Sequence, residues 1–332
     1  MRYVVRFIFA AFVGASGLGT VWSSPPSASG LAEDLQGVVE EEVWRAGGPR
    51  PERMLDYLRQ TEESGKPEAA SAVGKVLQPL FARRWLDPTP FAEYEKARSG
   101  ELNVVWQQEL ALWKMTAAER QREYAEVLRT GRSNHELGLT WNGAANRALL
   151  EQMDNLVPEI EATMERDPHA NYQKAETRVP RADLLELAHA RPGDWEANYL
   201  KLIREKIEAQ AQMAYPNSDP AANRLIREAL LELVHSGNKK LVPQLKALWR
   251  SIKDPEMDKP ENRRAYSEGV RRGWRDPDYP RSGLAAENLV RAIRALGDPS
   301  FQEKNTQHRK HLEDTKRRLV EAGWLKPTAE VQ

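Results

Sequence analysis

The chain has 332 residues, which is enough for two or three ordinary domains or for one extended helical array. Lys plus Arg and Asp plus Glu each number 49, so the chain lacks the net positive charge that favours binding to nucleic acid or to an anionic membrane surface. It contains no Cys, which excludes disulfides, thiolate catalysis and zinc sites with Cys ligands. Because the chain has no net positive charge, we expect no nucleic-acid partner.

The first residues have the layout of a secretory signal peptide. Arg2 and Arg6 precede a stretch from Phe7 to Trp22 that carries no charge. This stretch is shorter than the roughly 20 apolar residues that a membrane-spanning helix needs. We predict a signal peptide over residues 1–23, although small residues leave the cleavage site open between positions 17 and 29. The expected location is periplasmic or extracellular, with contact to the membrane through the N-terminal segment alone; an uncleaved inner-membrane anchor is the alternative.

Residues 31–131 predict an N-terminal helical region. Apolar residues recur at three- and four-residue steps from 31 to 43, and Pro51 is placed to open a second helix. A third helix is predicted from about 67 to 86. Thr116 and Glu119 form a capping-box pattern that predicts a helix to about residue 130. The Gly-, Ser- and Asn-containing segment 131–143 is interpreted as a domain boundary.

Residues 142–325 predict a second helical region. A helical pattern extends from 142 to 166, and Pro158 is expected to kink or break it because proline lacks the backbone N–H donor. A loop is expected over 168–180. Further helices are predicted at about 181–190, 194–213, 220–236, 240–253, 260–273, 284–296 and 300–323. Since no segment has a convincing strand pattern, the predicted fold is all-α, an irregular array of antiparallel helix pairs without a substantial sheet.

Two segments of the second region carry a family resemblance. Residues 181–213, with Leu184, Ala188 and the run from Pro192 to Ala197, resemble a tetratricopeptide-like helix pair. Residues 225–272, with the run from Leu241 to Leu245 and an Asp-Pro joint at 254, resemble HEAT-type repeats. The resemblance implies stacked helix pairs of the kind that bind proteins, but a fold alone does not establish a function.

The chain lacks the motifs of several enzyme classes. It has no nucleotide-binding loop, Gly-x-Ser-x-Gly, His-Glu-x-x-His or calcium loop. We therefore expect a non-catalytic protein without a cofactor. The alternative is an enzyme on an α-helical scaffold that acts on an envelope polymer through paired carboxylates from separate helices.

A weak candidate for a metal site lies near the C-terminus. His308, His311 and Asp314 are spaced by three residues, so they share one side of a helix. Many Lys, Arg and Glu residues surround them, which is typical of a solvated surface helix. The favoured expectation is that no metal binds.

Two joints between helices have nearly the same sequence. Arg83-Arg84-Trp85-Leu86-Asp87-Pro88 resembles Arg271-Arg272-Gly273-Trp274-Arg275-Asp276-Pro277. In a structural interpretation, Arg complements the helix dipole, Trp covers the joint and Asp-Pro begins the next helix. In a functional interpretation, an aromatic and cationic patch binds protein or glycan. The candidate binding residues are Arg271, Arg272, Trp274, Arg275, Tyr279 and Arg281. The leading hypothesis is an exported helical scaffold of the cell envelope that binds another protein.

Overall fold

The computed structural model describes residues 28–64, 67–167, 179–213, 218–254, 259–274, 281, 283–301 and 308–323. Over these residues the protein has fifteen α-helices, two short 3₁₀-helices and no β-strand, which confirms the all-α prediction. The α-helices are α1 (Ala28–Glu42), α2 (Pro51–Ser64), α3 (Pro67–Ala82), α4 (Thr89–Ser99), α5 (Val104–Lys114), α6 (Ala117–Thr130), α7 (Trp141–Leu150), α8 (Val157–Arg166), α9 (Arg181–Ala190), α10 (Trp195–Ala211), α11 (Pro220–His235), α12 (Val242–Ser251), α13 (Pro260–Arg271), α14 (Leu284–Leu296) and α15 (His308–Glu321). The 3₁₀-helices are η1 (Asp154–Leu156) and η3 (Lys239–Leu241).

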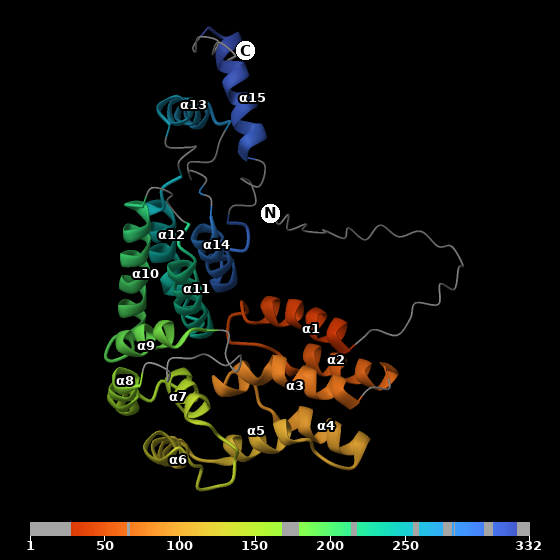
Figure 1. Ribbon diagram of the computed structural model, residues 1–332. Coiled ribbons are helices and arrows are strands. Elements are labelled where there is room, and N and C mark those ends of the chain that lie inside the picture. The colour runs from red at the N-terminus through yellow and green to blue at the C-terminus, as the bar shows by residue number, and fades with distance from the viewer. Residues whose placement is uncertain are drawn as a thin grey trace, which may run out of the picture.

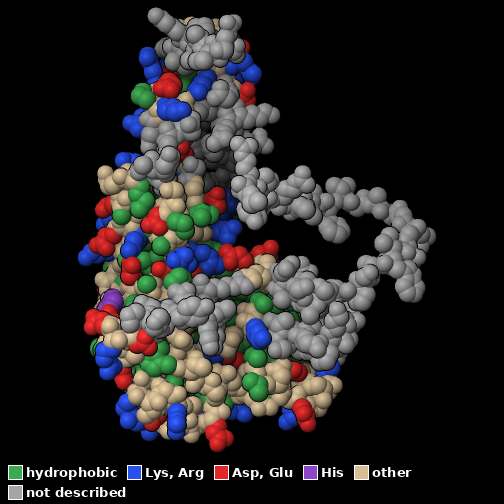
Figure 2. Space-filling view, viewed as in Figure 1, with side chains coloured by type: hydrophobic (Ala, Val, Ile, Leu, Met, Phe, Trp, Pro, Cys, Tyr) green, Lys and Arg blue, Asp and Glu red, His purple; other side chains and the backbone are tan. Residues whose placement is uncertain are grey.

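The helices form an array with a central column (Figure 1). In this column α11 packs against α10 and α14, and α12 packs against α10 and α14. Helices α1 to α5 lie across one side of its base, and α6 to α8 lie on the other side, below α9. The pair of α13 and α15 lies at the far end of the column (Figure 1). Figure 2 shows a group of Lys and Arg side chains beside acidic ones where the column meets the lower helices.

One large apolar cluster joins the N-terminal helices to the column. It includes Phe81 and Trp106 from the first half of the chain and Leu230 and Trp249 from the second half. A second cluster combines residues of α6 to α9, among them the fully buried Tyr124. The boundary predicted at 131–143 contains the loop between α6 and α7, and the second cluster draws residues from both sides of that loop.

Local signals fix several helix ends. α2 begins at Pro51 as predicted. At the start of α6 the Glu119 backbone N–H donates to Thr116 Oγ1 at 3.3 Å, and the Thr116 backbone N–H donates to Glu119 Oε2 at 2.7 Å. This reciprocal pair is the predicted capping box, which satisfies two backbone donors of the first turn.

Two breaks in the helical pattern lie elsewhere than predicted. The helical pattern from 142 to 166 forms α7 and α8, and the chain leaves α7 at residue 151, where Gln152 takes a φ of +58°. Pro158 does not cause this break, because it lies in the first turn of α8, where a missing N–H is tolerated. The predicted third helix ends at Ala82 rather than about 86, because Arg84 adopts a φ of +58°.

Other predicted segments lie partly outside the described residues. The signal peptide predicted over residues 1–23 lies outside the described residues, and so does the part of the predicted loop from 168 to 178. Among the described helices, none combines the length and the apolar character required to cross a bilayer.

Candidate functional site

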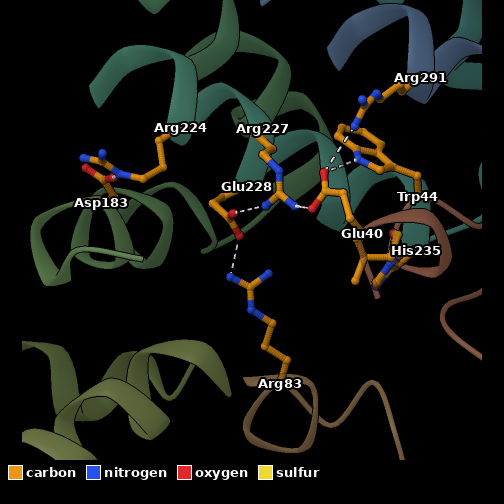
Figure 3. A network of polar contacts seen from close by, with 10 residues as sticks. Glu40, Trp44, Arg83, Asp183, Arg224, Arg227, Glu228, His235 and Arg291 are labelled. Atoms are coloured by element: carbon orange, nitrogen blue, oxygen red, sulfur yellow. Dashed lines mark hydrogen bonds and ion pairs between the residues drawn. The ribbon is translucent and has the colours of Figure 1, made fainter. Parts of the chain in front are cut away.

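A buried carboxylate lies where the N-terminal helices meet the column. Glu228 of α11 has a side chain that is 3% exposed, and two guanidinium groups bind it (Figure 3). Arg83, which follows α3, donates from Nη2 to Glu228 Oε2. Arg227 donates from Nη1 to Glu228 Oε1 at 2.6 Å. The carboxylate therefore ties the end of α3 to the centre of α11.

The same network continues toward solvent through Glu40 of α1. Arg227 donates its second nitrogen, Nη2, to Glu40 Oε2. Glu40 Oε1 accepts from Arg291 Nη1 of α14 at 3.2 Å and from Trp44 Nε1 at 3.3 Å. Figure 3 shows these groups converging on Glu40. One chain of ion pairs therefore connects α1, α11 and α14. We call Arg83, Glu228, Arg227, Glu40 and Arg291 the junction network.

Burial and charge act in opposite directions on the two carboxyl groups of α11. Burial acts to raise the pKa of Glu228, but the charges and hydrogen bonds of Arg83 and Arg227 outweigh it and hold that pKa below its ordinary value. One helical turn later, burial raises the pKa of Glu232, and nearby Arg residues compensate in part. Glu228 is therefore the ionised partner on which the network depends.

A small cleft opens beside the junction network. Its volume is about 90 Å³, and both carboxylates, Glu40 and Glu228, line it. This arrangement has the two carboxylates from separate helices that the enzymatic alternative requires. Arg227 binds both of them, however, so neither is placed to exchange a proton with a substrate. The cleft is also smaller than the roughly 300–1,000 Å³ of typical ligand pockets. Its geometry supports a structural role for the pair.

His235, at the end of α11, contacts the N-terminal region beside the junction network. Its Nε2 lies 2.7 Å from the Val43 carbonyl oxygen, and its ring meets the Trp85 ring edge-on with centroids 3.9 Å apart. Nδ1 is buried and has no hydrogen-bond partner among the described residues. Burial lowers the pKa of His235 to about 4, so the imidazole is neutral near pH 7.

The two joints that are similar in sequence also have the same backbone hydrogen bonds. The Trp85 N–H donates to the Leu80 carbonyl at 3.0 Å, and the Trp274 N–H donates to the Gly269 carbonyl at 2.8 Å. In each joint the residue before Trp has a positive φ, +58° at Arg84 and +70° at Gly273. This pattern is a Schellman motif at a helix C-terminus. In both, an Arg guanidinium lies over the Trp ring, at 4.4 Å in the first joint and 5.2 Å in the second.

The joints differ in what covers the Trp. Trp85 packs against His235, and Arg83 beside it binds Glu228, so α11 covers the first joint. Trp274 is 38% exposed. The second joint therefore presents its Trp to solvent, whereas its Arg272 is half-buried and bound to Glu268.

The structure brings three of the predicted binding residues together at the end of α13. Arg271 and Arg272 bind Glu268 at 2.6 and 2.7 Å. Arg272 and Arg318 of α15 place their guanidinium groups 5.2 and 5.4 Å from the Trp274 ring centroid. Arg281 donates to the carbonyl of Arg250 in α12 at 3.1 Å. Arg275 and Tyr279 lie outside the described residues.

A groove adjoins this end of the molecule. It lies between α13 and α15, has a volume of about 620 Å³, and is lined by Pro260, Arg263, Arg264, Ser267, Glu268, Arg271 and Leu319. The buried apolar residues beneath it, Ala265, Tyr266 and Leu319, form a small cluster of their own. The groove therefore has a mainly cationic lining above a small apolar cluster.

The candidate metal residues lie on α15. The side chains of His308 and His311 are outside the described part of the structure, whereas Asp314 pairs with Arg317 at 2.9 Å. Among the side chains that are described, no group of three potential metal ligands was found.

Sequence reasoning missed the junction network. One signal was available, because Glu228 lies three residues from both Leu225 and Leu231 and so falls on the buried side of α11. A carboxylate in such a place needs a partner. Its partner Arg83 is 145 residues away, and the helical pattern gives no sign of that pairing.

Comparisons with protein-family models, with curated proteins and with solved structures found no match for this chain.

Replacing Glu228 with Gln should destabilise the protein by about 3 kcal/mol or more, because Arg83 and Arg227 would keep their charges in a buried site without the carboxylate. Glu232→Gln is the matched control one turn away. It should cost about 1 kcal/mol or less, since burial already favours the neutral form of Glu232. Urea unfolding at pH 7 measures both values, and equal losses would contradict the role given to Glu228.

His235 should make the protein sensitive to mild acid. Its folded pKa of about 4 lies below the ordinary 6.5, so the unfolded chain binds the proton more readily. The free energy of unfolding should therefore fall as the pH is lowered from about 6.5 to about 4, by up to about 3 kcal/mol. The measurement is urea unfolding across this range for the wild type and His235→Phe. The difference between them isolates the His235 contribution, and parallel pH profiles would contradict it.

Proposed function

We propose that this protein is an exported, non-catalytic helical scaffold of the cell envelope that binds another protein. The contact surface is the groove between α13 and α15 together with Trp274, and the partner contributes an acidic helix. The single observation that carries the proposal is the repeated joint. The Trp that docks on α11 at the first joint has an exposed counterpart, Trp274, at the second, where Glu268 holds the neighbouring Arg272 in place.

The first joint indicates what kind of surface fits the second. There, a helix supplies a carboxylate to Arg83 and a ring to Trp85. Arg272 and Trp274 repeat that pair of groups. A partner helix with an acidic residue and, two turns later, an aromatic or His residue would meet the same requirements. Trp and Arg are also the residues that most often contribute strongly to binding at protein interfaces.

Charge supports the same partner. Helix α13 and the adjacent Arg272 contain four Arg and two Glu, and α15 contains five Lys or Arg and three acidic residues. The whole chain is neutral, so the positive excess at this end is local. Complementary charge accelerates association and discriminates against wrong partners. An acidic segment is therefore the favoured occupant of the groove.

The location in the cell envelope is supported by the N-terminal segment, with its two Arg residues followed by an uncharged stretch. On this proposal, the protein isolated from its native cells begins at residue 18, 24 or 30, after cleavage of the signal peptide. N-terminal sequencing with an intact mass tests this directly. A chain that retains Met1 or the following residues and sediments with membranes would favour the anchored alternative.

Replacing Trp274 with Ala should weaken partner binding about 30-fold, which corresponds to the roughly 2 kcal/mol of a strong interface contact. The measurement is purification of the tagged protein from its native cells under mild crosslinking, followed by quantification of the partner. Arg271→Ser should lower recovery more modestly and reduce its dependence on salt, because Arg271 is an exposed charge at the rim.

A matched control exists on α6. Arg129 is 66% exposed and pairs with Glu126 three residues earlier, much as Arg271 is 64% exposed and pairs with Glu268. Arg129→Ser should leave partner recovery unchanged. Loss of the partner in Arg129→Ser as well, or full recovery in Trp274→Ala, would refute the proposed surface.

A further inference from the structure

A separate cavity, away from the cleft and the groove described above, lies at the other end of the molecule between α3, α5 and α7. Its volume is about 360 Å³, within the range of small-molecule sites. Its polar lining comes from three helices and the preceding loop, namely Lys75, Gln78, Gln108, Thr140, Asn146 and Arg147. Ala82, Val105 and Leu139 supply an apolar wall. The junction network and the α13–α15 groove share none of these residues.

Two side chains of this cavity are buried and carry unused hydrogen-bond donors. Asn146 is 4% exposed, and its Oδ1 accepts from Arg181 Nε at 3.3 Å. That bond fixes the orientation of the amide, and the Asn146 Nδ2 group donates to no described residue. Buried amide donors are nearly always paired in folded proteins, and leaving one unpaired costs free energy. The Asn146 N–H groups, on the wall of the cavity, are therefore available to water or to a ligand there.

Arg147 lies beside Asn146 and is 6% exposed. One of its nitrogens, Nη2, binds Glu109, whose Oε1 also accepts from Gln78 at 3.0 Å. No hydrogen bond joins Arg147 Nε or Nη1 to another described residue. Glu109 thus fixes the guanidinium in place and leaves part of its donor set for a ligand. A guanidinium held in this way recognises the oxygens of a carboxylate or a phosphate well.

The charge of the cavity favours an anion. Lys75 is exposed at its rim and has no ion pair with any described residue, while Glu109 is already bound to Arg147. The N-terminus of α7 also faces the cavity, since Thr140 caps that helix and Gly143 in its first turn lines the wall. A helix N-terminus adds a partial positive charge. Gln108 makes no hydrogen bond to a described residue either, and its amide completes the polar side.

We propose that this cavity binds a small organic anion. Its carboxylate or phosphate group would lie against Lys75, Asn146 and Arg147, and its short carbon body would lie along Val105 and Leu139. The inference does not depend on the proposed protein-binding surface. It assigns the N-terminal half of the protein a role as a ligand-binding unit.

Calorimetric titration of the full-length protein tests this. The probes are inorganic phosphate, glycerol 3-phosphate, malate and glutamate, with uncharged glycerol as the reference compound. At least one organic anion should bind with a one-to-one stoichiometry, and glycerol should give no heat. Comparison of the phosphate and carboxylate compounds identifies the preferred head group.

Two variants and one control link the binding to this cavity. Lys75→Gln removes the rim charge, and Gln108→Glu introduces a repelling charge; each should weaken binding about tenfold or more. Neither side chain makes a hydrogen bond or ion pair to a described residue, and thermal unfolding checks that the fold is retained. Lys114→Gln removes an exposed charge of α5 outside the cavity and should have no effect. The proposal fails if no organic anion binds, if glycerol binds equally well, or if Lys114→Gln weakens binding as much as Lys75→Gln.

Discussion

The ionised carboxylate of Glu228 determines how the two parts of this protein meet. A buried carboxylate is costly unless charges and hydrogen bonds compensate for the water it has lost. Glu228 obtains both from Arg83 and Arg227, and Arg227 extends the network to Glu40 of α1. Because these partners come from elements far apart in the chain, they hold α1 and α3 against α11 in one relative position. The apolar cluster that crosses this junction contributes buried apolar area. The ion pairs determine which surfaces of these helices meet.

The junction also explains the contrast between the two similar joints. A Schellman turn after α3 places Arg83 and Trp85 on the surface of α11, where Glu228 and His235 receive them. The same turn after α13 leaves Trp274 exposed, while Arg272 binds Glu268 of its own helix. Two similar turns thus have different surroundings, because α11 packs against the first Trp and the second Trp is exposed. The proposed function follows from this difference, and it requires no unusual chemistry.

The sequence predicted those parts of the fold that depend on local signals. The bounds of α9 and α14, the start of α2 and the capping box of α6 follow from residues within a few positions of each other. Helix α4 received no predicted range, because its apolar residues gather in its first turns and show no helical period. The end of α7 was missed because Gln152 takes a positive φ that is uncommon outside glycine. The candidate sites combine residues such as Arg83 with Glu228 and Lys75 with Asn146, whose proximity only the tertiary fold creates.

The most direct test of the open joint is site-specific photo-crosslinking in the native cells. A photoreactive residue replaces Ser267, which is exposed and lines the α13–α15 groove, and in a separate strain it replaces Ala118, which is exposed on α6. We predict a crosslink from position 267 to an acidic helical segment of one protein, and no such product from position 118. Absence of a crosslink at 267, or the same products at both positions, would contradict it.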